Sequence, residues 1–206
     1  MSNIQLPVQI TTRKIVKPNL EIFYPFIVAG ANTNAILKMN QQIYNLVNKL
    51  IIDQGYYQSP HTTSVNGYYE IKTNERGVLS LTIINYTYRQ HAAHGLTIMK
   101  SLNFDTSTGN NYQLFELFKP GSDYKKVLSE IIQKQIKERD IPLLDGFKGV
   151  ESNQDYYIAD KALVIYYQLY ELTAYVYGFP MFPISVYEIQ NIINENSLLG
   201  VMAVNM

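Results

Sequence analysis

Two histidines lie three residues apart in the segment His91-Ala92-Ala93-His94-Gly95. This spacing can hold a metal ion when both residues are on one helix. Here the segment lies between two predicted strands, no HExxH glutamate accompanies it, and the third histidine, His61, lies on a predicted polar loop. A zinc site needs three or four protein ligands. We therefore expect no metal ligand here and a structural hydrogen bond for His94 at a turn.

Glu171 is the carboxylate of most interest because it follows an apolar stretch and lies between Tyr170 and Leu172. An acid in apolar surroundings must be paired or have a function. Acid–base catalysis needs a second carboxylate that faces the same cleft. Structural networks also hold such acids, so we favour a paired Glu171 and assign no catalytic residue. A carbohydrate-active hydrolase that uses Glu171 stays an alternative.

The chain lacks the motifs of common cofactor and nucleophile sites. It contains no GxGxxG, no GxxxxGK[ST] and no GxSxG, so we expect neither a nucleotide cofactor nor a serine nucleophile. It has no cysteine, which excludes disulfides and thiolate metal sites. Seventeen basic side chains balance seventeen acidic ones, so the charge that nucleic-acid binding usually requires is missing. We therefore expect a protein that is not an enzyme and has no cofactor.

The first residues, Met1 to Leu20, show no basic region followed by an apolar core, as a signal peptide would. No apolar run approaches the roughly 18 residues that a membrane-spanning helix needs. The sequence as written therefore predicts a cytoplasmic protein without a membrane span. Export or attachment to the surface is the alternative if a leader was removed.

The composition is rich in tyrosine, with eighteen tyrosines and no tryptophan. Tyrosine is common in antiparallel sheets, where its ring packs and its hydroxyl reaches the surface. It is also enriched in protein-binding surfaces. A tyrosine-rich sheet is the favoured interpretation, and an aromatic recognition surface is the alternative.

The first half of the chain predicts strands around one helix. Residues 7–15 and 20–28 form a hairpin about Pro18-Asn19, and Asn32 or Thr33 caps a helix to about Asp53. Residues 55–67 read as a polar loop, and a strand is expected at 68–72. Leu79, Leu81 and Ile83 then alternate with polar residues, as in a strand. A further strand at 97–105 ends in a hairpin loop at 106–110.

The second half predicts a helix from Ser122 to about Arg139 and an apolar strand within residues 156–170, covered on both faces. Ser185 and Glu188 have the spacing of a capping box, which predicts a short final helix to about Glu195. The element order indicates an α+β fold, an antiparallel sheet with helices packed on one side. We expect units 1–90 and 91–206 that share one core.

Several segments resemble the RsiV-like domain family of bacterial proteins. Tyr88–Gly95 resembles the family's "Y-x-x-G-G-A-H-G", although His91 and Ala92 stand where the family has paired glycines. Ala162–Tyr175 resembles "G-L-V-F-Y-F-x-x-Y-E-I-A-P-Y". Further likeness lies at Asn103-Phe104-Asp105, Thr108-Gly109, Leu114–Phe118 and Pro183–Ile189. The first half more loosely resembles a PdaC-like N-terminal unit, at Phe23-Tyr24-Pro25 and Met39-Asn40.

This resemblance implies a binding role, because the family includes the lysozyme-sensing part of a membrane anti-sigma factor. The transmembrane and sigma-binding regions of that factor are not in this sequence, and the PdaC-type deacetylase chemistry belongs to a separate domain. We therefore expect a non-catalytic module that binds a lysozyme-like protein or a cell-wall fragment. The candidate contact residues are His94, Tyr170, Glu171, Tyr175 and Tyr177. A cytoplasmic structural or assembly protein is a further alternative.

Overall fold

The computed structural model describes residues 6–203 and has an α+β fold. The chain divides into two compact units, residues 1–111 and 112–206. A division near residue 90 was expected from the sequence. That point lies between two strands that pair with each other, from the pair of Val78 with Asp105 to the pair of Thr87 with Leu96.

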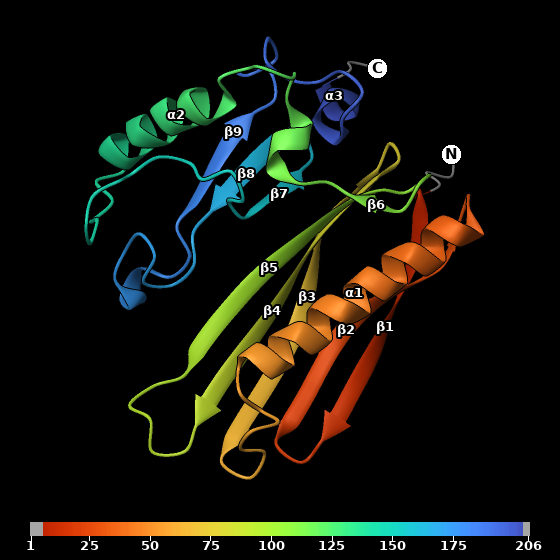
Figure 1. The fold of residues 1–206 in the computed structure, drawn as a ribbon, viewed down its shortest axis with the longest axis vertical. Coiled ribbons are helices and arrows are strands. Elements are labelled where there is room, and N and C mark those ends of the chain that lie inside the picture. Colours follow the sequence, from red (N-terminus) through yellow and green to blue (C-terminus); the bar gives the residue numbers. More distant parts are fainter. Residues whose placement is uncertain (1–5, 204–206) are drawn as a thin grey trace, which may run out of the picture. The chain divides into compact units, whose positions relative to one another are not determined.

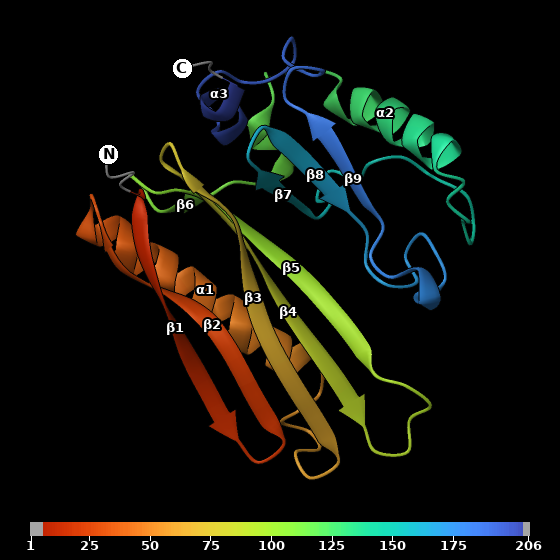
Figure 2. The same cartoon turned by 180° about the vertical axis from the view of Figure 1, so that it is seen from behind.

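A six-stranded sheet and one long helix form the first unit (Figure 1). The strands are adjacent in chain order: β1 (Val8–Lys17), β2 (Leu20–Gly30), β3 (Thr63–Glu75), β4 (Val78–Arg89), β5 (Leu96–Asp105) and β6 (Asn110–Asn111). Helix α1 (Thr33–Asp53) lies along one face of this sheet, and Figure 2 shows the opposite face, without a helix from this unit.

Helix α1 begins where the sequence predicts it. The side chain of Asn32 accepts hydrogen bonds from the backbone N–H groups of Asn34 (2.9 Å) and Ala35 (3.3 Å), which have no partners within the helix. The buried side chains of the helix recur at spacings of three and four residues and share one core with buried residues of β2, β3, β4 and β5. They are Ala35, Met39, Ile43, Val47, Leu50 and Ile51.

The sheet differs from the prediction at one pair of strands. Leu20–Ile22 of β2 pair in parallel with Val65–Gly67 of β3, whereas the other neighbouring strands are antiparallel. The reason is the connection: α1 carries the chain back along the sheet, so β3 starts at the same end as β2. The sheet is therefore mixed rather than wholly antiparallel, while its helix lies on one face as expected.

The hairpin loop between β5 and β6 is bonded to the first half of α1. Asn32 donates a hydrogen bond to the carbonyl of Ser107 (3.0 Å), and Gln42 donates one to the carbonyl of Gly109 (2.9 Å). Lys38 also donates to the side chain of Asn110. Gly109 has φ of +70°, and a Cβ atom there would lie 2.6 Å from the carbonyl oxygen of Ala35. A glycine is needed here for both its backbone angle and its size.

The second unit contains a three-stranded antiparallel sheet, with β8 (Ala162–Tyr166) between β7 (Tyr156–Ala159) and β9 (Met181–Ser185). Leu163–Tyr166 are buried, so the prediction of a central strand covered on both faces is confirmed. Helix α2 (Tyr124–Glu138) lies beside β9 (Figure 1), where Gln135 and Arg139 donate hydrogen bonds to the carbonyls of Pro183 and Met181 (both 2.8 Å).

The prediction of a helix from Ser185 to about Glu195 is wrong. Ser185 ends β9, and its hydroxyl accepts a hydrogen bond from the backbone of Tyr187 (3.3 Å), so the side chain stabilises a turn. The final helix, α3 (Leu198–Ala203), starts later. It lies next to the short 3₁₀ helix η1 (Leu114–Leu117), to which Ser197 donates a hydrogen bond at the carbonyl of Leu117 (3.0 Å).

Candidate binding loop

Residues 167–180 form a long loop between β8 and β9, which we call the aromatic loop. Its base is closed by a hydrogen bond from the backbone N–H of Tyr167 to the carbonyl of Pro180 (3.1 Å). Its first turn is closed by Glu171, whose backbone N–H donates to the carbonyl of Gln168 (3.2 Å). The carboxylate of Glu171 accepts from the backbone N–H of Gln168 (2.7 Å), so the turn is bonded in both directions.

The tip of the aromatic loop is the 3₁₀ helix η2 (Tyr175–Tyr177). Backbone hydrogen bonds from Tyr177 to Ala174 (2.9 Å) and from Gly178 to Tyr175 (3.1 Å) close this turn. Gly178 ends it with φ of +78°, a conformation that glycine adopts without strain. The side chain of Val176, at the centre of the turn, is 94% exposed.

Two tyrosines from different parts of this loop contact each other. The rings of Tyr170 and Tyr175 lie 5.5 Å apart at an angle of 33°. Tyr170 is 47% exposed and Tyr177 is 39% exposed. Tyr170 holds a φ of +66°, which is unfavourable for a residue with a side chain and is found most often where a function or tight turn requires it. The loop thus exposes Tyr170, Val176 and Tyr177 together.

Glu171 does not lie in the apolar surroundings that its neighbours in the sequence predicted. Its side chain is exposed at the turn, because the chain leaves the buried strand at Tyr167 before reaching it. The backbone of Gln168 donates to Glu171, and the side chain of Gln168 donates to Asp155 (2.8 Å). The partner of the Glu171 carboxylate is therefore a backbone N–H group rather than a cation.

Tyr167 is the buried titratable group next to this turn. Burial, together with the charges of Glu171 and Glu151, raises the pKa of its hydroxyl. Its ring packs edge-on against Phe147 (6.2 Å) and Phe182 (5.9 Å). The hydroxyl has no hydrogen-bond partner within residues 6–203. Tyr167 therefore anchors the base of the aromatic loop in the core of the second unit.

His94 belongs to the first unit, in the turn between β4 and β5. The side chain is exposed, and its Nδ1 atom lies 2.9 Å from the carbonyl oxygen of Gly95, so the expected hydrogen bond at a turn is confirmed. A Cβ atom at Gly95 would lie 2.3 Å from the ring of Tyr86, so a larger residue there would require this ring to move. The structure brings together the other candidates, Tyr170, Glu171, Tyr175 and Tyr177, on one loop of the second unit.

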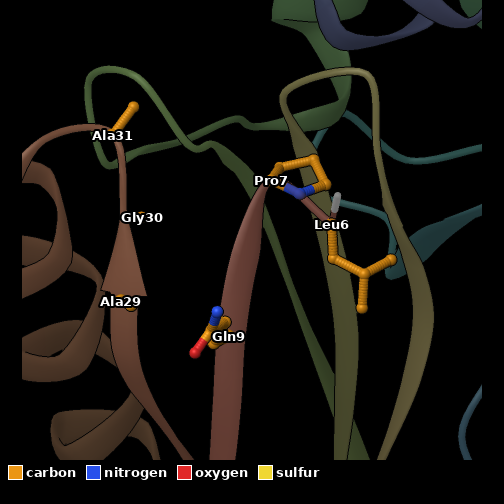
Figure 3. A pocket seen from close by; sticks show the side chains of 6 residues that line it. All are labelled: Leu6, Pro7, Gln9, Ala29, Gly30 and Ala31. Carbon is orange, nitrogen blue, oxygen red and sulfur yellow. The ribbon is translucent and has the colours of Figure 1, made fainter. Parts of the chain in front are cut away.

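Among residues 6–203, no group of three or more histidine, aspartate or glutamate side chains is placed to hold a metal ion. A hollow of about 380 Å³ lies between the start of β1 and the end of β2 (Figure 3). Among residues 6–203, Gln9 provides the only polar side chain of its lining, which otherwise consists of Leu6, Pro7, Ala29, Gly30 and Ala31. This hollow offers no titratable group and no aromatic ring for chemistry or recognition.

The aromatic loop lies inside a segment that matches a known family. Residues 116–187 match DUF3298, a family of proteins of unknown function. This DUF3298 segment begins in η1 and ends just after β9, so it includes α2, the three-stranded sheet and the whole aromatic loop. His94 lies outside it. The comparison with curated proteins gives no match.

Two solved structures of the DUF3298 family have a similar fold. A member from Bacteroides fragilis is 13% identical, with a TM-score of 0.72 over 96% of this chain and 98% of the other. A member from Pseudomonas aeruginosa is 12% identical, with a TM-score of 0.71 over 93% of this chain and 96% of the other. The likeness shows that the fold continues beyond the DUF3298 segment into the first unit. No helix in the described part of the chain is both long and apolar enough to cross a membrane.

Val176 is the residue of this loop that the sequence analysis missed. A signal was available, since an aliphatic residue between two tyrosines is followed here by Gly178 and Pro180, which mark a turn. These residues predict the turn, whereas the exposure of Val176 on it is seen only in the structure.

Proposed function

We propose that this protein is a non-catalytic binding module whose aromatic loop contacts a protein partner. The observation that carries the proposal is the exposure of Val176, 94%, on an ordered turn flanked by Tyr175 and Tyr177. An isolated exposed valine is ordinary, but this one shares its turn with two tyrosines, and Tyr170 contacts one of them, so the loop exposes several large side chains. Tyrosine is among the residues that contribute most to protein–protein binding.

The loop is also held by contacts within the second unit itself. Hydrogen bonds close its base, its first turn and its tip, and the ring of Tyr167 fixes it to the core. A loop that is already ordered loses less conformational entropy on binding than a flexible one, which favours affinity. The strained φ of Tyr170 supports the same proposal, because strain tends to persist where a function requires the geometry.

Lysozyme is the first partner to test, because the sequence resembles the lysozyme-sensing RsiV-like domains. One feature of the first unit supports this resemblance. His91, which stands where the resembled motif has a glycine, has φ of +69° and so retains the backbone angle that glycine favours. A lysozyme partner requires the protein to be exported or attached to the surface. In the cytoplasm, the same loop would contact a cytoplasmic partner.

The test is a calorimetric titration of the whole chain with lysozyme at moderate salt, using a matched pair of variants. Val176→Lys places a charge at the exposed tip and should weaken binding by at least about tenfold, as expected for a central contact. Val16→Lys is the control, because Val16 is also exposed (58%) and lies at the end of an edge strand, where lysine is well tolerated. Both variants should unfold at the wild-type temperature.

Saturable one-to-one binding that is lost in Val176→Lys and kept in Val16→Lys would support the proposal. Equal affinities of the two variants for lysozyme would refute the role of the loop, and absence of binding by the wild-type chain would refute lysozyme as the partner. Tyr175→Ala is a less direct test, since Tyr175 is only partly exposed and packs on Tyr170. Loss of the Tyr175 ring would change the structure of the loop as well as its exposed surface.

A further inference from the structure

A second candidate site lies in the first unit, in a pocket of about 260 Å³ between α1 and the hairpin of β1 and β2. Two elements build it. Its helix side is formed by Leu37, Asn40, Gln41 and Tyr44, whose spacings of three and four residues put them on one face of α1. Its strand side is formed by Arg13, Tyr24 and Phe26. Arg13 and Tyr24 are directly paired across the two strands.

Arg13 is the only charged residue in this pocket. Its guanidinium carbon lies 3.2 Å from the centre of the Phe26 ring, so the group is stacked on an aromatic face. No carboxylate of residues 6–203 forms an ion pair or hydrogen bond with Arg13. The stacking fixes the plane of the guanidinium while its N–H donors stay free. A group in this state is pre-organised to bind a carboxylate through two parallel hydrogen bonds.

The rest of the pocket is neutral, with aromatic and amide groups. The ring of Tyr44, 46% exposed, lies 6.3 Å from the ring of Tyr24. Both polar atoms of the Asn40 side chain already have a partner, since the oxygen accepts from the backbone N–H of Ile27 (2.8 Å) and the nitrogen donates to its carbonyl (2.9 Å). The Nε2 atom of Gln41 donates to Asn45 (2.8 Å), which leaves the carbonyl oxygen of Gln41 as an acceptor.

These groups together define the ligand. We propose that the pocket binds a monosaccharide that carries one carboxylate. The guanidinium of Arg13 would bind the carboxylate, and the ring of Tyr44 would cover the apolar face of the sugar. The hydroxyl of Tyr44 and the carbonyl of Gln41 would bind sugar hydroxyls. The volume of about 260 Å³ lies just below the range of pockets for drug-sized ligands, which fits a single sugar ring.

The test compares two sugars that differ mainly in the acid. The whole chain is titrated with N-acetylmuramic acid and with N-acetylglucosamine, which has the same ring without the carboxylate-bearing lactyl group, and binding is followed by NMR shifts at low salt. We expect saturable binding of the acidic sugar, and affinity for the neutral sugar lower by about tenfold or more. A charge-assisted hydrogen-bond pair accounts for a difference of this size.

The matched variants are Arg13→Gln and Lys14→Gln. These neighbours lie on opposite faces of β1, because successive residues of a strand alternate. Both remove one positive charge, but only Arg13→Gln removes it from the pocket. Arg13→Gln should lower the affinity for the acidic sugar by about tenfold, and Lys14→Gln should leave it unchanged. Tyr44→Ala, at a half-exposed helix position, should lower the affinity for both sugars without unfolding the chain.

Three results would overturn this inference: equal affinity for the two sugars, equal loss in the two glutamine variants, or absence of binding by the acidic sugar up to about 10 mM. The inference does not depend on the aromatic loop. The lysozyme titration can therefore fail while this pocket binds its ligand, and the sugar titration can fail while lysozyme binds.

Discussion

Replacing Gly109 with alanine should destabilise the first unit by about 2–4 kcal/mol, the sum of two terms. The left-handed backbone of Gly109, φ +70°, costs a residue with a Cβ atom about 1 kcal/mol. The new methyl group would also lie 2.6 Å from the carbonyl oxygen and 3.0 Å from the Cα atom of Ala35. Both are backbone atoms of α1, so relief requires moving the helix, and such overpacking costs about 1–3 kcal/mol.

Gly77→Ala is the matched control, because Gly77 lies in the same unit and has a similar φ of +78°. The nearest atom to its new Cβ would be the hydroxyl oxygen of Thr106, at an ordinary 3.9 Å. Gly77→Ala should therefore lose only the backbone term, about 1 kcal/mol. Urea unfolding followed by circular dichroism measures both losses. Equal losses would show that the approach of the hairpin loop to α1 has no energetic cost.

Two further predictions concern polar groups. Burial alone would raise the pKa of Asp105, but hydrogen bonds from Ser107 and Thr108 lower it overall. This carboxylate thus stabilises the fold above its unfolded pKa of about 3.9, and the contribution is lost as pH falls through the lower folded pKa. Ser107→Ala should therefore lower the urea midpoint at pH 6 and have less effect near pH 2. Tyr167→Phe removes a buried hydroxyl without a described partner and should keep or increase stability, whereas Tyr56→Phe loses the bond to the Pro18 carbonyl (2.7 Å) and about 1 kcal/mol. Thermal melts of this pair that rank in the opposite order would contradict the hydrogen-bond assignment.

The elements that local signals determine could be predicted from the sequence. Asn32 before a stripe of apolar residues predicts the start of α1, and the structure bears this out with two capping hydrogen bonds. Pro18-Asn19 predicts the first hairpin, and Asn19 indeed has φ of +59° between β1 and β2. In both cases the interaction that forms the element lies within a few residues of the chain, so a short segment contains it.

The predictions that were wrong concern structure that depends on contacts between segments distant in the sequence. The parallel pairing of Leu20–Ile22 with Val65–Gly67 depends on how α1 returns the chain across the sheet, which no local pattern encodes. The spacing of Ser185 and Glu188 fits a helix cap, but Met181–Ser185 is paired with β8, and Ser185 stabilises a turn at the end of that strand. Pairing in a sheet overrode a local helix signal.

The two candidate binding surfaces differ in the same way, since one is formed by neighbours in the sequence and the other by distant segments. Tyr170, Glu171, Tyr175 and Tyr177 are close in sequence, so one loop could bring them together, and it does. The pocket of Arg13 combines a strand residue with residues on a helix face, and the sequence analysis did not identify it. Its signal was the cross-strand position of Arg13 opposite Tyr24, which becomes informative only when the register of the hairpin is known.

The tyrosines show why composition alone could not separate a packed sheet from a recognition surface. Tyr166 and Tyr170 are four residues apart, yet Tyr166 is fully buried and Tyr170 is 47% exposed. The difference arises because the chain leaves β8 after Tyr166 and turns at Tyr170 with φ of +66°. Tyr166 thus fits the interpretation of a packed sheet, whereas Tyr170 is exposed and stays a candidate for the recognition surface. The position of each ring relative to the end of its strand decides whether it packs in the core or is available to a partner.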